Sequence, residues 1–300
     1  MSKTSQELLS QPDCWRIAST LAGELCGPHR RAGADLLPAH GLRVAMTGCG
    51  TSLYMAQAVA AWRELGGYGE TDAFAASEMP AGRSYDLVVT ISRSGTTTEV
   101  VRLIHELKPA NRVLAITSAL GTPVADAADS AIDLPFADEA SVVQTRFATS
   151  VCALWRAHFG QNVRTLADEA ELALAKPPAA GLDRFSQFVF LGRGAGAALA
   201  SEAALKFREA ALAWSEAYPA MEFRHGPISV IGAHTLVWPL GELDRELAER
   251  IAATGATVRP SAGDPMVDLV TVHQAAEALA VEKGLDPDRP RRLTRSVVLA

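Results

Sequence analysis

Short apolar runs alternate with amphipathic stretches along the chain, and this pattern predicts a parallel α/β fold. In the first half we expect five strands, at residues 43–47, 71–75, 85–91, 112–117 and 131–134. Apolar residues recur at helical spacing between or after them, which predicts helices at 53–65, 97–107 and 141–159. An earlier helical pattern runs from Trp15 to Leu25 and is expected to end at Gly27-Pro28. Strands that alternate with helices favour a parallel sheet with right-handed crossovers.

The pattern restarts after a proline-rich segment, Lys176 to Gly181, which is the best candidate for a linker. In the second half we expect strands at residues 188–191, 214–218, 235–239 and 256–259, and helices at 197–212, 242–254 and 273–283. Because the two halves repeat one architecture, we predict two flavodoxin-like, three-layer α/β/α units, each with a mainly parallel sheet. The expected domains are residues 1–178, an N-terminal helix plus the first unit, and residues 181–300, the second unit with a C-terminal tail.

Composition narrows the class of protein. The chain has 300 residues, of which 48% are hydrophobic and 21% charged, as in a soluble globular protein with ample core. Its formal net charge of −6, with acids and bases interspersed, argues against nucleic-acid binding. The four cysteines lack metal-ligand spacing, so we expect reduced thiols and no metal or other cofactor. Without a signal peptide or a long apolar run, we expect a cytoplasmic protein that does not span a membrane.

The segment from Ser92 to Glu99 is the most informative part of the sequence, because an apolar strand there runs into a hydroxyl-rich turn and then a helix. We expect Thr96 to cap that helix and Glu99 to act as its capping-box partner. Backbone N–H groups, the helix dipole and several hydroxyls would converge where the strand ends, which is the donor set that a phosphate needs. Arg93 is a candidate for a further, charged donor.

A single loop of this kind is explained equally well by an ordinary capped helix after a turn. However, a second strand-to-helix loop, Gly48-Cys49-Gly50-Thr51-Ser52, is expected at the same edge of the sheet. Two convergent loops favour phosphate binding. Neither loop has the Gly-Lys-Ser/Thr ending of a Walker P-loop. The run from Gly192 to Gly196 resembles a dinucleotide fingerprint but is by itself a weak signal, so the sequence does not favour an NAD-dependent oxidoreductase.

A second segment carries candidate proton-transfer chemistry. Glu202, Lys206 and Glu209 share one helical face. A solvated, salt-bridged face is the usual explanation for such spacing. The surrounding alanines and leucines argue instead for a helix packed on both sides, where a carboxylate beside a lysine is a plausible proton-transfer group. His225, before Gly226-Pro227, is by itself more typical of a turn or core residue than of a catalyst.

Taken together, these segments make the chain resemble the double sugar-isomerase (SIS) domain proteins, typified by the isomerase half of glucosamine-6-phosphate synthase. The resemblance covers nearly the whole chain. It rests on five ordered motifs: Gly48-Cys49-Gly50-Thr51-Ser52, Ser92-Arg93-Ser94-Gly95-Thr96-Thr97, Leu205-Lys206-Phe207-Arg208-Glu209, Glu222-Phe223-Arg224-His225-Gly226-Pro227 and the tail from Asp288 to Val297.

The resemblance implies roles for individual residues. The phosphate of a phosphorylated sugar would be held by Ser92, Ser94 and Thr97, and its sugar would be lined by Thr51 and Ser52. Glu209 would move a proton between C1 and C2, with Lys206 beside it in the site. His225 would assist ring opening from the partner subunit, which implies a homodimer.

Several positions depart from the synthase. Arg295 stands where the synthase has a Schiff-base lysine, and arginine is not a practical nucleophile. Gln144 occupies the place of a substrate-contacting serine. Residue 2 is serine, so we expect no glutaminase domain with an N-terminal cysteine nucleophile. The sequence therefore predicts an isomerase, deaminase or deglycase that acts on a hexose or hexosamine 6-phosphate. The alternative is a non-catalytic sugar-phosphate sensor.

Overall fold

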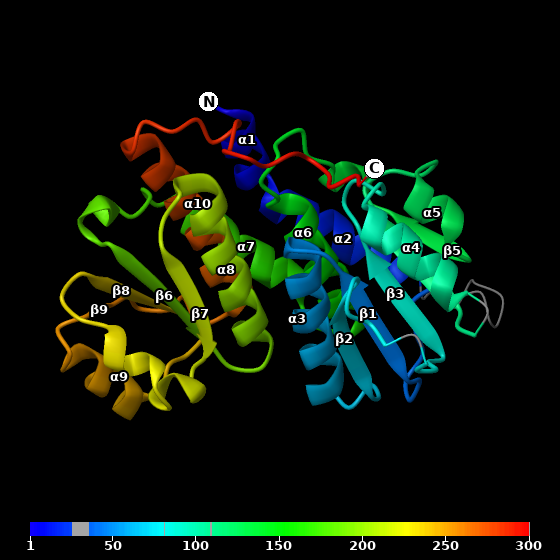
Figure 1. The fold of residues 1–300 in the computed structure, drawn as a ribbon, viewed down its shortest axis with the longest axis horizontal. Coiled ribbons are helices and arrows are strands. Elements are labelled where there is room, and N and C mark those ends of the chain that lie inside the picture. The colour runs from blue at the N-terminus through cyan, green and yellow to red at the C-terminus, as the bar shows by residue number, and fades with distance from the viewer. Residues whose placement is uncertain (26–35, 81, 109, 300) are drawn as a thin grey trace. The chain divides into compact units, whose positions relative to one another are not determined.

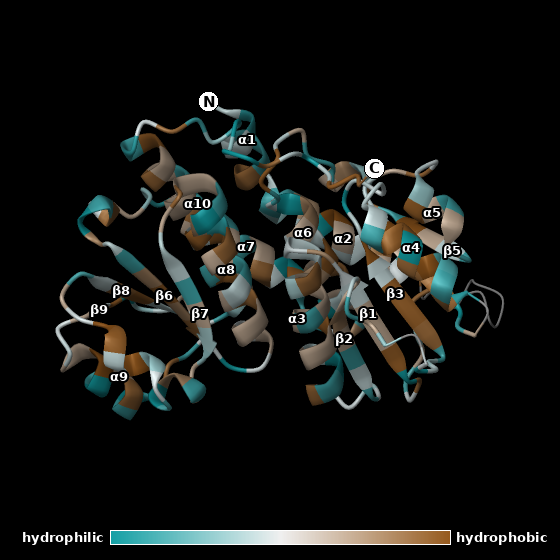
Figure 2. Cartoon of the chain, viewed as in Figure 1, coloured by the Kyte–Doolittle hydropathy of each residue, from teal (hydrophilic) through white to brown (hydrophobic). Residues whose placement is uncertain are grey.

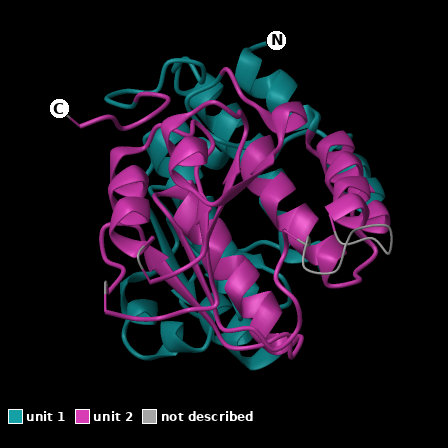
Figure 3. Cartoon of the chain, turned by 90° about the vertical axis from the view of Figure 1, so that its right-hand side faces the viewer, with its two compact units in different colours: residues 1–10, 141–145, 168–293 teal, residues 11–140, 146–167, 294–300 magenta. Residues whose placement is uncertain are grey.

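The computed structural model describes residues 1–25, 36–80, 82–108 and 110–299. They form two compact units (Figure 3), of which unit 1 comprises residues 1–10, 141–145 and 168–293 and unit 2 comprises residues 11–140, 146–167 and 294–300. The units are interleaved along the chain: residues 1–10 belong to unit 1, which otherwise lies mostly in the second half, and residues 294–300 belong to unit 2, which lies mostly in the first half. The break expected at Gly27-Pro28 lies outside the described residues.

The sheet of unit 2 is parallel throughout, as predicted (Figure 1). Its strands are β1 (Val44–Gly48), β2 (Thr71–Ala75), β3 (Leu87–Ile91), β4 (Val113–Thr117) and β5 (Ser130–Asp133). The order β2-β1-β3-β4-β5 is that of flavodoxin-like, doubly wound sheets. Every residue of β1, β3 and β4 is buried, which explains their mostly apolar sequences, seen in brown for β3 in Figure 2.

The same unit contains helices before, between and after these strands. They are α2 (Gln11–Leu25), α3 (Thr51–Leu65), α4 (Thr98–Leu107), α5 (Pro123–Ala127) and α6 (Arg146–His158). The apolar face of α4 packs with Val88, Val113 and Ala115 of the sheet into one hydrophobic cluster. Because that face is buried, the start of α4 is held at the carboxyl edge of the sheet, where β3 ends.

Unit 1 repeats the architecture with a four-stranded parallel sheet. Its strands are β6 (Gln187–Gly192), β7 (Ser215–Pro219), β8 (Thr235–Leu240) and β9 (Thr257–Val258), in the order β7-β6-β8-β9. Its helices are α1 (Lys3–Leu9), α7 (Val163–Leu174) from Asp168 onwards, α8 (Ala195–Ala211), α9 (Arg245–Ala252) and α10 (Pro265–Glu282). No helix in the described part of the chain is long and apolar enough to cross a membrane.

Two helices begin more than four residues from their predicted starts. The helix expected from Ser141 begins at Arg146 as α6, because the Glu139 carboxylate accepts hydrogen bonds from the backbone N–H groups of Arg146 (2.9 Å) and Phe147 (3.4 Å) and so caps it. The helix expected from His273 begins two turns earlier, at Pro265. Asp264 caps it by accepting the N–H of Met266 at 2.9 Å. A capping aspartate before proline is a start signal that the sequence contains.

The capping box expected at Thr96 and Glu99 is wrong. The N-cap of α4 is Thr97, and no side chain among the described residues makes a capping hydrogen bond there. The Thr96 hydroxyl is instead engaged with Ser94 and Ser296. The N-terminal turn of α4 therefore has no side-chain cap.

Candidate functional site

The hydroxyl-rich loop of unit 2 lies between β3 and α4. Ser92 follows directly on the strand and is 3% exposed, while Thr97 is the N-cap of the helix. Their hydroxyl oxygens lie 3.3 Å apart. The loop thus brings two of the predicted phosphate ligands together at the positive end of the α4 dipole.

The second predicted loop lies at the same edge of the same sheet. Thr51 and Ser52 are the first residues of α3 and are both 4% exposed. They follow β1, the neighbour of β3, and the register pairs Thr47 with Thr90. Because both parallel strands end at the same level, the two loops converge as the sequence predicted, at the edge where ligands of such sheets bind.

The C-terminal tail packs on the hydroxyl-rich loop. Ser94 Oγ donates to Ser296 Oγ at 3.0 Å, and Thr96 Oγ1 lies 3.1 Å from Ser94 Oγ and 2.8 Å from Ser296 Oγ. These three hydroxyls form a closed ring. In addition, the N–H of Thr98 donates to the carbonyl of Val297 at 3.3 Å. The tail is thus hydrogen-bonded both to loop hydroxyls and to an N-terminal amide of α4.

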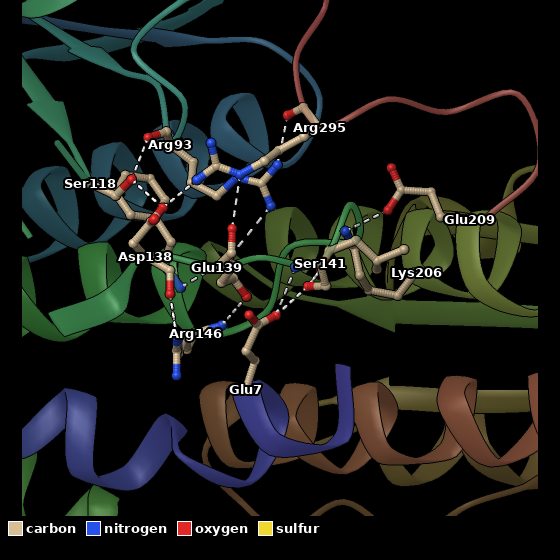
Figure 4. A network of polar contacts seen from close by, with 12 residues as sticks. Glu7, Arg93, Ser118, Asp138, Glu139, Ser141, Arg146, Lys206, Glu209 and Arg295 are labelled. Atoms are coloured by element: carbon tan, nitrogen blue, oxygen red, sulfur yellow. Dashed lines mark hydrogen bonds and ion pairs between the residues drawn. The ribbon is translucent and has the colours of Figure 1, made fainter. Parts of the chain in front are cut away.

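Arg93 lies in the loop, but its guanidinium is directed at protein groups (Figure 4). Its side chain is 1% exposed, lies 3.9 Å from the buried carboxylate of Glu139 and donates to the Arg295 carbonyl at 2.7 Å. These contacts indicate that Arg93 fixes the loop and the tail. A direct contact with substrate, as expected from the sequence, stays a prediction.

The side chain of Arg295 is also held by unit 2 (Figure 4). Its Nε donates to the Glu139 carbonyl at 2.9 Å, and a terminal nitrogen lies 2.5 Å from Asp138 Oδ1. Asp138 also accepts the Ser118 hydroxyl at 2.7 Å. The guanidinium therefore anchors the tail through an ion pair. Asp138 and Glu139 were not singled out from the sequence, because Arg295 and Arg93, with which they form ion pairs, lie far away along the chain.

In unit 1, helix α8 carries a buried triad of charges (Figure 4 shows two of its members, Lys206 and Glu209). Lys206 Nζ lies 3.2 Å from Glu202 Oε1 and 2.6 Å from Glu209 Oε2. The side chains of Lys206 and Glu202 are 2% and 0% exposed, so a solvated salt-bridged face is excluded for them. The Glu209 side chain is 20% exposed and is the member that solvent or a ligand reaches.

The two carboxylates of the triad determine the protonation state of Lys206. Burial alone would lower the pKa of Lys206, but the carboxylates of Glu202 and Glu209 outweigh it, and the net pKa is raised. Lys206 is therefore an ammonium at neutral pH. An ammonium hydrogen-bonded to a partly exposed carboxylate is an arrangement suited to proton transfer.

The two other predicted residues also belong to unit 1. Gln144 lies in the segment 141–145, and its neighbours Val143 and Thr145 line a small cavity together with Lys206. His225 follows a 3-10 turn, Glu222–Arg224, and is exposed. The predicted residues thus fall into two groups, with Thr51, Ser52, Ser92, Arg93, Ser94, Thr97 and Arg295 in unit 2 and Gln144, Lys206, Glu209 and His225 in unit 1.

Relatives in sequence are isomerising glutamine–fructose-6-phosphate aminotransferases. The chain is 29% identical over 266 residues to that of Clostridium acetobutylicum, covering 71% of this chain and 44% of the relative. It is 28% identical over 360 residues to the enzyme of Thermus thermophilus, and the match covers 98% of this chain and 58% of the relative. The chain therefore spans about half the length of these relatives.

Solved structures share the fold. Glucosamine-6-phosphate deaminase of Thermotoga maritima matches with a TM-score of 0.80 and 25% identity, over 99% of this chain and 100% of that one. Tagatose-6-phosphate ketose/aldose isomerase of Escherichia coli matches with a TM-score of 0.78 and 21% identity, over 96% of this chain and 95% of that one. Residues 36–157 match the SIS domain family. The match thus relates this part of the chain to SIS domains.

Proposed function

We propose that this protein binds a hexose or hexosamine 6-phosphate and acts on it as a deaminase or deglycase, or as an aldose–ketose isomerase. The observation that carries the proposal is the contact of 2.6 Å between the buried Lys206 ammonium and the partly exposed Glu209 carboxylate. A purely structural ion pair on α8 needs no exposed member, whereas a proton-transfer group must be reachable by substrate.

In this proposal unit 2 anchors the phosphate. Ser92, Ser94 and Thr97 supply hydroxyl donors at the start of α4, and Thr51 and Ser52 line the sugar. The buried guanidinium of Arg93 adds positive charge behind the loop without occupying it. An anchored phosphate fixes the sugar's position, and fixed geometry is a large part of the advantage of such enzymes.

Glu209 is the proposed base. Aldose–ketose isomerisation moves one proton between C1 and C2 through an enediol, so a single carboxylate that alternates between the carbons suffices. The Lys206 ammonium donates a hydrogen bond to Glu209 and holds its carboxylate in place. His225 is proposed to assist ring opening from the partner subunit of a homodimer, and Gln144 to contact the sugar.

The arginine at position 295 favours a reaction that releases ammonia over one that transfers ammonia to a ketose. Arginine stays protonated, so it cannot form a Schiff base with a ketose. The structural relative from Thermotoga maritima is named as a deaminase, and it matches this chain over its whole length. We also infer three-layer units and a cytoplasmic enzyme.

The proposal is tested by measuring ammonia release and sugar products in parallel across amino sugar phosphates, fructosamine phosphates and hexose 6-phosphates. The Glu209→Gln variant is expected to lose about 10²–10⁴-fold in kcat, the usual contribution of a general base. Glu282→Gln, an exposed carboxylate on α10, is the matched control and keeps full activity. Full turnover by Glu209→Gln would refute the assignment. Tight phosphosugar binding without any turnover would favour the sensor.

A further inference from the structure

Helices α1 and α10 of unit 1 lie side by side (Figure 1) and leave a groove between them. The groove has a volume of about 390 Å³, which is within the range of sites for small molecules. Its apolar walls include Leu8 and Leu9 of α1, Ala278 and Val281 of α10, and Pro178. No residue assigned above to the phosphate site or to proton transfer lines this groove, so it is a separate feature of the molecule.

One carboxylate in the groove is fixed through a single oxygen. Glu277 Oε1 accepts the Ser2 hydroxyl at 2.7 Å and also accepts the Ser5 hydroxyl, and these bonds hold the carboxylate against α1. Its Oε2 forms no hydrogen bond or ion pair with any residue that the structure describes, and it is not a buried atom. Glu277 therefore offers the groove an oriented carboxylate oxygen that no cation of the protein neutralises.

A second acceptor lies one helical turn away on the same face of α10. Gln274 lines the groove, and its Nε2 donates to the carbonyls of Leu174 at 3.0 Å and Lys176 at 3.2 Å. Because carbonyls only accept, these two bonds fix the orientation of the amide. Its Oε1 has no hydrogen-bond partner within the described ranges and is not a buried atom. Gln274 thus adds an oriented, neutral acceptor.

The hydrogen-bonding capacity of the groove is one-sided. The hydroxyl of Ser5 is donated to Glu277, and the amide N–H groups of Gln274 are donated to backbone carbonyls. No lysine, arginine or histidine of the described chain lines the groove. What remains is a negative charge and a second acceptor, which match an ammonium group with its three donors and no acceptor. An anion would be repelled, and the apolar walls suit a hydrocarbon body.

We propose that the groove between α1 and α10 binds a small primary ammonium compound with an apolar body. The ammonium donates to Glu277 Oε2 and Gln274 Oε1, and the hydrocarbon part packs along Leu9, Ala278 and Val281. A partner protein would require a much larger surface than this groove provides. The inference does not rest on the proposed enzymatic function.

The first test compares three probes of equal chain length, hexylammonium, hexanol and hexanoate, by calorimetric titration of the full chain. We expect hexylammonium to bind at least about tenfold more tightly than hexanol, as for one hydrogen bond to a charged group, and hexanoate not to bind. In ¹³C-methyl-labelled protein, hexylammonium should shift the signals of Leu9 and Val281, which Leu9→Met and Val281→Ile assign. Equal affinity for hexylammonium and hexanol would overturn the proposal, as would unshifted signals of both methyl groups.

Two substitutions separate the charge from the apolar walls. Glu277→Gln keeps an oxygen that accepts the Ser2 and Ser5 hydroxyls, so α1 stays in place, but it removes the negative charge. It should weaken hexylammonium binding roughly ten- to a hundredfold and leave hexanol binding within about twofold. Ala278→Leu fills the groove and should weaken both probes. Glu169→Gln, an exposed carboxylate on α7, is the matched control and should bind like the parent. Parental affinity of Glu277→Gln for hexylammonium would contradict the proposal.

A second copy of the chain is the competing occupant of the groove. Val281→Asp places a charge on its exposed wall, and sedimentation velocity measures the oligomeric state of this variant and the parent. The same oligomeric state in both proteins would support a groove that is open to a small molecule. Dissociation of a parental dimer by Val281→Asp would show that a second copy covers the groove and would overturn the proposal.

Discussion

The first strand-to-helix turn of each unit has nearly the same backbone but different chemistry. In unit 2, Gly50 precedes α3 with φ 55° and ψ −125°, and in unit 1, Gly194 precedes α8 with φ 52° and ψ −124°. A Cβ on Gly48 would lie 2.6 Å from Ser52 Cβ, and a Cβ on Gly192 would lie 2.1 Å from the carbonyl carbon of Gly196. Both turns therefore need glycine for left-handed φ and for close packing of helix on strand.

The side chains that follow these turns differ. The helix of unit 2 begins with Thr51-Ser52, whereas that of unit 1 begins with Ala195-Gly196. The next connection is Ser92–Thr97 in unit 2, but Gly241–Asp244, with two carboxylates, in unit 1. These connections therefore present hydroxyl donors to an anion in unit 2. In unit 1 they present no hydroxyl, and the carboxylates of Glu242 and Asp244 would repel an anion. This difference supports the proposal that the phosphate site lies in unit 2.

The contrast between the two units predicts that the hydroxyls of unit 2 contribute to phosphate binding. We expect Ser94→Ala combined with Thr97→Val to weaken phosphosugar binding by about 100-fold or more, since each hydrogen bond to a charged group contributes about 1.5–3 kcal/mol. Calorimetric titration with a hexose 6-phosphate measures the loss. Ser229→Ala, an exposed hydroxyl of unit 1, is the control and should bind like the parent. Equal binding by all three proteins would contradict an anchor in unit 2.

The shared backbone predicts shared sensitivity to a methyl group. Gly48→Ala and Gly192→Ala should each destabilise the protein by about 1–3 kcal/mol through overpacking. Gly192→Ala should cost more, because its Cβ would meet backbone at 2.1 Å. The midpoints of urea-induced unfolding measure the loss of stability in both variants. Gly23→Ala, within α2 and without a neighbour in 4 Å, should be neutral or stabilising. A stable Gly192→Ala would show that the two turns are not equivalent.

The buried charges of unit 1 predict a specific acid sensitivity. Because His273 has a folded-state pKa of about 3, below its unfolded value, the unfolded chain binds a proton that the native protein does not. Its contribution to stability is therefore lost as pH falls below about 6.5, at up to about 1.4 kcal/mol per pH unit. His273→Gln should show a shallower fall in unfolding free energy between pH 6 and 5 than the parent. Parallel curves would contradict a buried neutral imidazole.

The smallest effect is expected at the middle residue of the unit 2 turn. Burial, and then the Glu99 carboxylate, raise the pKa of Cys49 to about 11, so the thiol is neutral and unreactive at pH 7. We expect Cys49→Ser to change phosphosugar affinity by no more than roughly twofold, as for substitutions outside special contacts. Slow alkylation of Cys49 at pH 8 would support this result. A large loss of binding would instead place the thiol in the site.

Local sequence patterns predicted most of the strands and the hydroxyl-rich chemistry of the loops. The apolar runs Val44-Ala45-Met46 in β1 and Leu87-Val88-Val89 in β3 predict strands, and the threonine that follows each run is also buried. Element starts were predicted less well where a cap came from an unexpected side chain, as with Glu139 at α6. The capping signal at Asp264-Pro265 was present in the sequence and would have placed the start of α10 correctly.

The sequence by itself determined a parallel α/β repeat, a hydroxyl-rich loop at a helix start and a carboxylate–lysine pair on one helical face. These features depend on residues that are neighbours along the chain or one helical turn apart. Only the tertiary structure decided that Arg93 is held by Glu139 and that Ser296 closes a hydroxyl ring with Ser94. Those contacts join segments up to 202 residues apart, and no local periodicity records which distant segments the packing of a core brings together.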